Sequence, residues 1–379
     1  MKKKYLIISI SVLLVLSTCL YVFVSDTTEK VVISSNKESN RSVVNTNALT
    51  MMYETEAGSG EYQVSSDTSW PTDGYTFNET LSKCENGSAL TWDNENKRVV
   101  VSTSVSDKCY VYFDKEPDVI YLASYITSQY TTDGENGLYY HDADLANGAG
   151  DNSYRFSGAN PNNYVCFGTD EVSCPEDNLY RIIGVFNGQV KLIKSTSYGK
   201  YVWESDWDTQ GNTWDETTKP DIYTTLNTTY YNTLGSEWQS KIATHSWKVG
   251  GMARDDTATA KDYYDTEVGT GQSGYEETMK IGLMYVSDYG YGASEEYWTT
   301  ELNNYEPTVD SNWMYLGAYE WLISRHSSTT SSAFNVNATG CVDYGIVGYT
   351  YAVRPSFYLE SDVTYASGSG SMTDPLKIN

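Results

Sequence analysis

The chain has 379 residues, which is enough for one large domain and smaller pieces. Fifty acidic residues against 25 basic ones give a formal net charge of −25. A surface of this charge repels nucleic acid and anionic lipid, so we expect no nucleic-acid partner. The 35 tyrosines are typical of adaptable binding surfaces, although Tyr-rich strands are also common in exported β-proteins.

The N-terminal segment, MKKKYLIISISVLLVLSTCLYVFVSD, has three lysines followed by an uncharged run over residues 5–24. Such a run is long enough to cross a bilayer as a helix, and the lysines favour an internal N-terminus. We predict a signal anchor over residues 1–25, with the remainder of the chain extracellular. Two alternatives stay open, because LSTC, ending at Cys19, resembles a lipoprotein cleavage box, and cleavage near Ser25 would release a secreted protein.

The rest of the chain divides by composition into four parts. Residues 26–67 are polar and without periodicity, which predicts a flexible spacer. Residues 68–116 contain the β-type runs ALTWD, RVVVSTS and CYVYFD between turn-rich stretches, which predicts a small β module. Residues 117–132 form a connection with one brief helix in DVIYLASYI, and residues 133–379 form the largest part.

Four of the six cysteines form two close pairs in the sequence. In an exported chain this spacing predicts two local disulfides, Cys84–Cys109 and Cys166–Cys174. The first would close a loop, and the chain-entropy model gives such a cross-link about 3 kcal/mol of unfolding free energy. A zinc site is the competing interpretation, but the chain has no CxxC motif and its three histidines are widely scattered. Cys341 is left over as either a buried or a free thiol.

The largest part alternates short strands with helical stretches. In YRIIGVFNGQVKLIKS two apolar runs flank Asn187-Gly188, which predicts a tight hairpin. DIYTTLNTTYY predicts a helix with Asp221 as N-cap, and GSEWQSKIA continues the spacing after a break at Gly235. KIGLMYVSDYGYGASEEYW predicts a strand and then a second helix. Two helices among many short antiparallel strands predict the α+β class.

Residues 351–359, YAVRPSFYL, are apolar at alternate positions, as in a half-buried strand. Pro355 lacks a ladder donor and belongs at a strand edge or a strand start. Arg354 lies on the opposite side from the apolar positions. We therefore expect it to bind a carboxylate or backbone carbonyls and to lock the strand.

The order of the hairpin, the helix in NTWDETTKPDIYTTLN, LMYVSDYGYG, EWLISR and AVRPSFYL resembles a family of bacterial extracellular domains with a C-terminal VRP strand. Those domains are similar in turn to the C-type-lectin-like fold of sulfatase-modifying factors. The resemblance covers residues 133–379, and the whole chain resembles surface proteins of gut Gram-positive bacteria. It implies a C-type-lectin-like fold, a cell-surface location and structural roles for Trp321, Arg354 and Pro355. It implies no known activity.

An oxidase of the sulfatase-modifying branch needs a cysteine pair beside the closing strand, with one cysteine directly after the arginine. Here that position is Pro355 and only Cys341 lies near, so two sulfurs cannot hold a soft metal. No histidine accompanies a recognisable nucleophile, and acidic residues are too abundant to single out a catalytic pair. We therefore expect no enzyme, with an exported glycan hydrolase as the remaining catalytic alternative.

Two stretches contain candidate ligand-binding residues. In YYHDADLANGAGDNSYR, Asp142, Asp144, Asn147 and Asp151 are clustered oxygen donors of the kind that Ca²⁺ prefers. The alternative is a solvated acidic loop in which Asp and Asn shape the turns.

In VWESDWDTQGNTWDE, Trp203, Trp207 and Trp214 offer a platform for stacking sugars, or else they fill the core. Together these features favour a cell-surface binding or adhesion protein whose ligand is a glycan or another surface protein. The second hypothesis is a structural envelope protein without a specific ligand.

Overall fold

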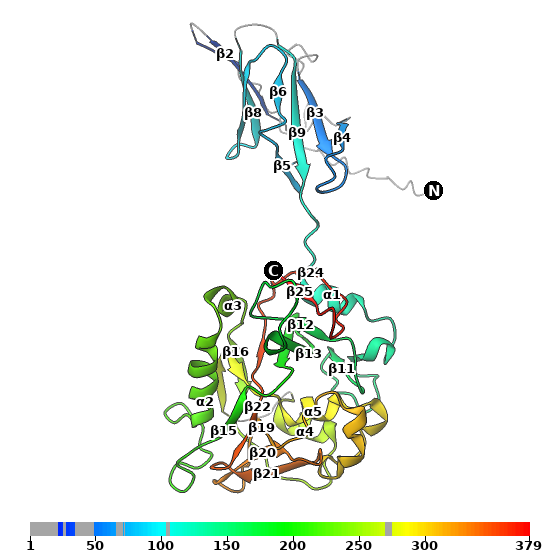
Figure 1. Cartoon of the computed structure of the whole chain (residues 1–379), viewed down its shortest axis with the longest axis vertical. Helices are drawn as coiled ribbons and strands as arrows, with labels where there is room; N and C mark the ends of the chain where they lie inside the picture. Colours follow the sequence, from blue (N-terminus) through cyan, green and yellow to red (C-terminus); the bar gives the residue numbers. More distant parts are fainter. Residues whose placement is uncertain are drawn as a thin grey trace, which may run out of the picture. The chain divides into compact units, whose positions relative to one another are not determined.

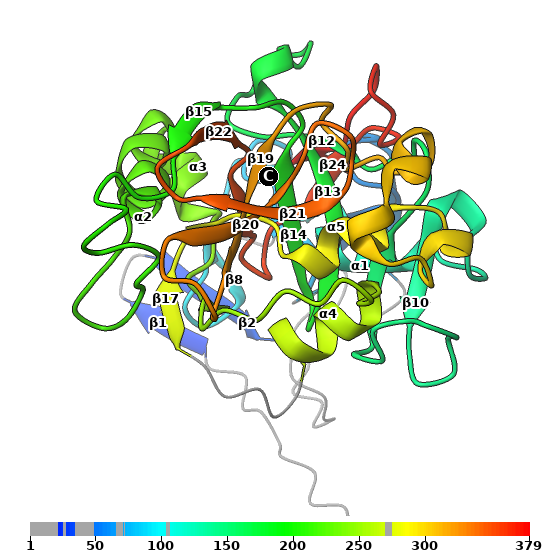
Figure 2. The same cartoon turned by 90° about the horizontal axis from the view of Figure 1, so that it is seen from below.

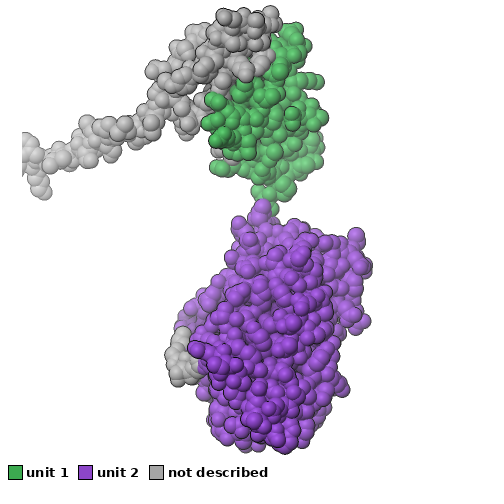
Figure 3. Space-filling model, turned by 90° about the vertical axis from the view of Figure 1, so that its left-hand side faces the viewer, with its two compact units in different colours: residues 1–118 green, residues 119–379 purple. Residues whose placement is uncertain are grey.

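The computed structural model describes residues 22–25, 28–34, 49–65, 71, 73–103, 107–269 and 275–379. The chain divides into two compact units, unit 1 over residues 1–118 and unit 2 over residues 119–379 (Figure 3). The described residues are rich in strands, and the α-helices are short and lie in unit 2 (Figure 1). The predicted α+β class is therefore confirmed.

Within the described part of the chain, no helix is long and apolar enough to span a membrane. The predicted anchor over residues 1–25 lies almost wholly outside the described residues. Its last four residues form strand β1 (Val22–Ser25), which pairs with β2 (Thr28–Ser34).

The described residues of unit 1 form two sheets. One has the strand order β1-β2-β8-β7, and the other has the order β4-β3-β9-β5 with β6 paired to β9. The remaining strands of the unit are β3 (Leu49–Glu54), β4 (Tyr62–Val64), β5 (Tyr75–Phe77), β6 (Lys83–Cys84), β7 (Ala89–Asp93), β8 (Arg98–Thr103) and β9 (Cys109–Lys115). Val99, Val111 and Phe113 are buried at the centre of its small core.

The predicted spacer over residues 26–67 is wrong for its described part. Strand β3 pairs in parallel with β9, and β4 pairs with β3, so both belong to the β module. Met51 and Tyr53 of β3 pack against the core of unit 1. The strand pattern of LTMMYE is hard to recognise because the residues on both sides of it are polar. Its pairing partner β9 lies more than fifty residues later in the chain, so local composition gives no indication of the pairing.

In unit 2 the residues that the structure describes form two large sheets and two small ones. The seven-stranded sheet has the order β10-β11-β13-β14-β23-β18, with β12 paired to β13. Its strands are β10 (Leu138–His141), β11 (Ser153–Phe156), β12 (Tyr164–Cys166), β13 (Leu179–Phe186), β14 (Gln189–Lys194), β18 (Ile281–Gly282) and β23 (Ser356–Tyr358). The two-stranded sheets pair β16 (His245–Lys248) with β17 (Glu276–Met279), and β24 (Tyr365–Ser367) with β25 (Lys377–Ile378).

The five-stranded sheet of unit 2 has the order β15-β22-β19-β20-β21, and Figure 2 shows β19 to β22 close together. Its strands are β15 (Gly199–Val202), β19 (Glu320–Arg325), β20 (Ser332–Val336), β21 (Val342–Ile346) and β22 (Thr350–Val353). All neighbours are antiparallel except β19 and β22, which run parallel with Glu320 opposite Ala352.

The Asn187-Gly188 hairpin is confirmed. It joins β13 to β14 with φ values of 49° and 79° at the two turn residues, which is the left-handed region that such a turn requires.

The described residues contain five α-helices. They are α1 (Leu122–Ser128), α2 (Asp221–Thr224), α3 (Ser236–Ser240), α4 (Ala260–Glu267) and α5 (Val286–Gly292). Helix α1 is the brief helix predicted in DVIYLASYI, and the four others lie in residues 133–379, where two were expected. The sequence pattern did not reveal α4, although Thr259 and Asp262 form a capping box at its start. The expected N-cap at Asp221 is also wrong, because Pro220 occupies that position and the Asp221 carboxylate accepts a hydrogen bond from Ser205 N at 3.1 Å.

The boundary of the largest part lies earlier than residue 133. Unit 2 begins at Val119, and Leu122 and Ile126 of α1 are buried in its core. The helix predicted in the connection is therefore part of the domain, because its apolar side chains are buried in the core of unit 2.

Candidate functional site

The three tryptophans proposed as a sugar platform have different environments. Trp203 and Trp214 are buried, with ring centroids 5.7 Å apart in an edge-to-face arrangement. The Trp203 indole donates a hydrogen bond to the carbonyl of Leu322 at 3.3 Å. Trp207 is 50% exposed. A platform made of all three is therefore not formed, and two of the three fill the core.

The five-stranded sheet of unit 2 has aromatic side chains on one face. Tyr201 of β15 lies directly opposite Tyr351 of β22. The Tyr351 ring stacks on Tyr319 with centroids 4.9 Å apart, and it covers the buried Trp321 with centroids 4.4 Å apart. Tyr349 lies at the edge of this group, 6.0 Å from Tyr351.

Trp207 lies beside the same group, because its indole packs over the backbone of Gly348. A Cβ atom placed on this glycine would lie only 3.1 Å from the indole. We call Tyr201, Trp207, Tyr319, Tyr349 and Tyr351 the aromatic face. Trp207 and Tyr349 are both 50% exposed and Tyr319 is 45% exposed, so their rings are open to solvent.

Polar groups border the aromatic face along β20 and β21. Asp343 of β21 pairs with Arg254, whose guanidinium also lies 5.1 Å from the Tyr344 ring. Asn335 of β20 is opposite both Trp321 and Asp343 in the sheet register. Its Oδ1 is buried and accepts no hydrogen bond from the described residues. A buried amide oxygen without a donor is destabilising, so this atom is an unused acceptor beneath the rings.

The oxygen donors of the predicted calcium loop have other partners. Asp142 Oδ1 accepts hydrogen bonds from the backbone N–H groups of Asp144 and Leu145, as in an Asx turn. Asp151 Oδ2 accepts a hydrogen bond from Arg155 at 2.6 Å. Asn147 has a φ of 58° and accepts a hydrogen bond through its carbonyl.

The loop and part of α4 line an open cleft of about 720 Å³. Among the described residues, no group of three or more His, Cys, Asp or Glu side chains is arranged to hold a metal ion. Calcium binding stays a prediction, which a comparison of melting temperatures with and without a chelator tests.

Arg354 and Pro355 lie where the chain passes from one large sheet to the other. Strand β22 ends at Val353 in the five-stranded sheet, and β23 begins at Ser356 in the seven-stranded sheet. The predicted single strand is therefore broken by the proline, and residues on both of its sides are buried. Arg354 forms a bidentate ion pair with Glu320, at 2.7 and 2.9 Å, and donates to the carbonyl of Met314. Arg354 therefore binds the kind of partner that we expected, a carboxylate and a carbonyl.

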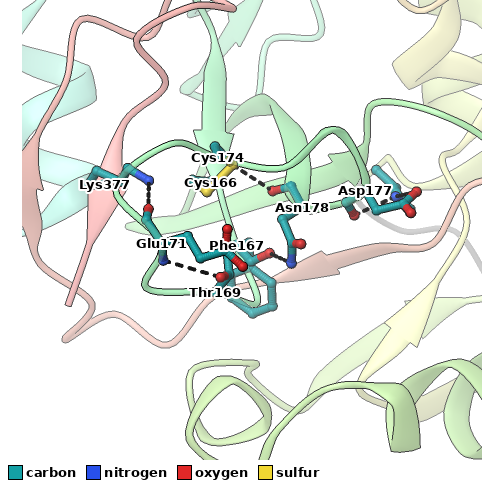
Figure 4. Close-up of a disulfide and its surroundings, with 9 residues drawn as sticks. Cys166, Phe167, Thr169, Glu171, Cys174, Asp177, Asn178 and Lys377 are labelled. Atoms are coloured by element: carbon teal, nitrogen blue, oxygen red, sulfur yellow. Dashed lines mark hydrogen bonds and ion pairs between the residues drawn. A yellow bond between two sulfur atoms is a disulfide. The ribbon is translucent and has the colours of Figure 1, made fainter.

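Both predicted disulfides are confirmed. Cys84–Cys109 joins directly opposite residues of β6 and β9. Cys166–Cys174 closes a surface loop that is also fastened by Lys377, whose Nζ donates to the carbonyl of Glu171 at 2.7 Å (Figure 4). Cys341 is a buried free thiol that donates to Glu306, and burial raises its pKa. It is therefore a neutral thiol.

A second group of polar side chains, which the sequence did not reveal, lies inside unit 2. Lys191 of β14 is completely buried, and its Nζ is 2.5 Å from Oδ2 of Asp288 on α5. Arg155 of β11 lies 3.5 Å from the other oxygen of Asp288 and 2.6 Å from Asp151. We call Asp151, Arg155, Lys191, Glu267 and Asp288 the buried charge network.

Glu267, the last residue of α4, brings a third carboxyl group to this network. It accepts hydrogen bonds from the backbone N–H groups of Val286 and Ser287, at 3.0 and 3.1 Å, and from the Ser324 hydroxyl. The Asp288 carboxylate accepts a hydrogen bond from the backbone N–H of Tyr285, at 2.9 Å. Three successive N–H groups at the start of α5 thus hold the two carboxyl groups side by side.

Burial dominates the electrostatics of this network. It raises the pKa of Glu267 to about 7, although hydrogen bonds from Ser324, Ser287 and Val286 act in the opposite direction. Burial also lowers the pKa of Lys191, and Asp288 offsets this only in part. At neutral pH Glu267 is therefore able to accept or release a proton, and Lys191 gives up its proton more readily than an exposed lysine does.

Neither the aromatic face nor the buried charge network follows from local sequence patterns. Tyr349 and Tyr351 alternate along one strand, which is a local signal for a shared face. Tyr201 and Tyr319, however, reach that face only through the order of strands in the sheet. Lys191 appears in the sequence as one polar residue within an apolar strand.

Three comparisons with known proteins place no constraint on the function. No family model, no curated protein and no solved structure matches the chain.

Proposed function

We propose that this protein is a cell-surface binding protein that takes a glycan on the aromatic face of unit 2. The observation that carries the proposal is the group of solvent-open rings on one sheet, with Tyr319 stacked on Tyr351 and with Tyr349 and Trp207 beside them. Pyranose rings present flat apolar C–H surfaces that pack on aromatic rings, while phenol hydroxyls bind the sugar hydroxyls. Binding through rigid aromatic side chains needs little ordering of the site, because each tyrosine has only two side-chain torsions.

The polar border suits the same ligand. Asp343 and Arg254 are partly exposed and offer an acceptor and a donor next to the rings. A sugar hydroxyl that reached Asn335 Oδ1 would supply the donor that this buried oxygen lacks, and would recover free energy otherwise lost on burial. The specificity of the site would then reside in β20 and β21, and its affinity in the rings.

Three further features of the protein belong to this proposal. The fold of unit 2 is C-type-lectin-like, which the resemblance of residues 133–379 supports. The location is extracellular, which the two disulfides support, because such bonds persist in oxidising compartments. The attachment is an N-terminal anchor in residues 1–25, supported by the lysines and the apolar run of the sequence.

The test is binding of the purified protein to a broad panel of immobilised glycans, followed by titration of the best ligand. Tyr349→Ala combined with Trp207→Ala should weaken binding at least tenfold, which corresponds to about 1.4 kcal/mol. Tyr121→Ala is the matched control, since Tyr121 is a 49% exposed tyrosine of the same unit on α1's N-cap, outside the aromatic face. It should leave affinity unchanged.

Three results would overturn the proposal. Equal losses in the double variant and the control would place the ligand elsewhere on the protein. No binding on a panel of glycans and surface proteins would favour the structural envelope protein instead. Turnover of a glycan that disappears with one carboxylate substitution would identify a hydrolase.

A further inference from the structure

Lys191 and Asp288 meet in a buried part of unit 2, and Glu267 is bound at the adjoining start of α5. The Lys191 side chain is 0% exposed and that of Asp288 is 2% exposed. Four aromatic rings surround the lysine nitrogen at centroid distances of 4.4 to 5.7 Å, namely those of Phe186, Trp247, Tyr285 and Tyr358. An ammonium group and a carboxylate that are both stripped of water each lose several kcal/mol of hydration.

The geometry brings an amine next to a carboxyl group. Lys191 Nζ lies 2.5 Å from Asp288 Oδ2, so the amine nitrogen is held against one carboxyl group in a fixed orientation. Asp288 cannot turn away, because Tyr285 N–H donates to the same oxygen and Arg155 lies 3.5 Å from Oδ1. Holding two reactants at contact distance in a rigid site replaces an unfavourable encounter by an intramolecular step.

We propose that Lys191 and Asp288 form an intramolecular isopeptide bond, with Glu267 as the residue that relays the proton. In the reactive state the lysine is a neutral amine and Asp288 is a neutral carboxylic acid, which exchanges one buried ion pair for two uncharged groups. The lysine nitrogen attacks Cγ of Asp288, and a C–N bond forms. Glu267 takes a proton from the nitrogen and gives it to Oδ2, and the C–Oδ2 bond then breaks as one water molecule leaves.

The remaining groups fit these roles. Oδ1 stays behind as the amide oxygen, next to the Arg155 guanidinium, which stabilises the negative charge that develops there during the attack. Burial of the amine lowers the pKa of Lys191 against the opposing effect of Asp288, and the same guanidinium lowers it further, which favours the nucleophilic neutral form. Glu267 is fixed beside Asp288 by adjacent N–H groups of α5, and its pKa near 7 suits a group that both accepts and donates a proton. No oxidant, metal or cofactor enters this reaction.

The bond would join β14 to α5 across a separation of 97 residues. It would tie the centre of the seven-stranded sheet to the helix that follows its edge strand β18. Such a tie does not depend on the redox state of the surroundings, unlike the two disulfides.

The first test is the intact mass of the full-length protein after reduction of the disulfides and complete denaturation. We expect the mass to be lower than that of the sequence by one water molecule. Digestion with trypsin should yield one branched peptide that joins residues 182–194 to residues 281–325, because trypsin does not cleave after an acylated Lys191. A mass equal to that of the sequence, or a mass loss located in another peptide, would overturn the proposal.

Variants separate the roles of the three residues. Lys191→Met and Asp288→Ala should restore the full mass, while Lys194→Met is the matched control on the same strand and should keep the loss of water. Lys194 is also largely buried, but its Nζ donates to the backbone carbonyl of Asp177. Glu267→Gln should form the bond more slowly, so that freshly refolded protein keeps the full mass of the sequence for longer than the wild type does. A Glu267→Gln protein that closes the bond at the wild-type rate would remove Glu267 from the reaction.

The mass measurement on the wild-type protein needs no variant to fold, so an unstable Lys191→Met protein leaves the test intact. The reaction is independent of ligand binding at the aromatic face. A cross-linked protein that binds no glycan would therefore contradict the proposed function alone.

Discussion

Two buried ion pairs of unit 2, Arg354–Glu320 and Lys191–Asp288, have similar burial and different chemistry. Their side chains are all at most 2% exposed. The Arg354 guanidinium makes two hydrogen bonds to Glu320 and a third to the carbonyl of Met314, so its planar donors are directed at oxygen. The Lys191 amine has one carboxylate oxygen on one side and aromatic rings on the others.

The difference teaches that burial alone does not define the role of an ion pair. Arginine remains charged in proteins, and its fork matches a carboxylate, so the Arg354 pair acts as a clamp at the crossing between two sheets. A buried lysine loses its proton far more readily and is then a nucleophile. Four experiments test this contrast.

The largest effect is expected for Lys191→Met. If the isopeptide bond forms, this substitution removes a cross-link that closes a loop of about 100 residues, worth about 5 kcal/mol of unfolding free energy in the chain-entropy model. Urea denaturation followed by tryptophan fluorescence measures the loss. Lys194→Met should lose far less, and equal losses in the two variants would show that Lys191 contributes only packing.

Arg354→Met should lower the unfolding free energy by about 3–5 kcal/mol, because Glu320 is then a buried charge without a partner. The double variant Arg354→Met, Glu320→Gln should recover part of this loss, since glutamine carries no charge. The same denaturation experiment measures both. A double-mutant cycle compares the loss of unfolding free energy in the double variant with the sum of the losses in the two single variants. Equality of the two would contradict a direct pairing of Arg354 with Glu320.

The third effect depends on pH. The pKa of Glu267 is raised by folding, from its ordinary value near 4.5 to about 7. Its contribution to stability is therefore fully present below pH 4.5 and is lost as pH rises through 7, by an amount on the order of 3 kcal/mol. The unfolding free energy of the wild type relative to Glu267→Gln should accordingly fall between pH 5 and pH 8.

His245 acts in the opposite direction and must be separated from Glu267. Burial lowers its pKa to about 4, so its contribution is present above pH 6.5 and is lost as pH falls through 4. The comparison of wild type with Glu267→Gln cancels this contribution, because both proteins contain His245. A difference that stays constant from pH 5 to pH 8 would show that Glu267 has an ordinary pKa.

The smallest effect is expected for Thr259→Ala at the start of α4. The substitution removes half of a capping box and should cost about 1 kcal/mol. Because α4 ends at Glu267, it should also slow the proposed amide formation, which mass spectrometry during refolding would detect. Lys261→Ala, in the exposed first turn of the same helix, is the control and should change neither quantity.

Local chemistry predicted several features of the fold. The Asn187-Gly188 turn, the disulfide pairs and the strand-to-helix stretch around α5 each depend on residues that are close in sequence. The partner class of Arg354 was also predictable, because a buried guanidinium needs oxygen acceptors. The identity of that partner was not, since Glu320 is adjacent only through the parallel pairing of β19 with β22.

The candidate sites were harder to predict for the same physical reason. The similar contexts of Trp203 and Trp207 give no indication that one is buried and the other is exposed. The aromatic face requires β15 to lie next to β22, about 150 residues later in the chain, and the buried charge network requires β11, β14, α4 and α5 to meet. Sequence periodicity indicates which side of a strand is apolar, but it does not specify the neighbouring strand.

The position of β23 has a consequence for the order in which the protein folds. This strand lies between β14 and β18, and Ser356 Oγ donates to the carbonyl of Leu192, 164 residues earlier in the chain. Until β23 has been synthesised, β14 and β18 therefore each lack the neighbouring strand that pairs with them in the finished sheet. Contacts of such long sequence separation form slowly and leave exposed strand edges open to aggregation. The seven-stranded sheet is completed only when β23 (Ser356–Tyr358) has been made, so a product that stops before residue 356 lacks the strand that joins β18 to the rest of the sheet.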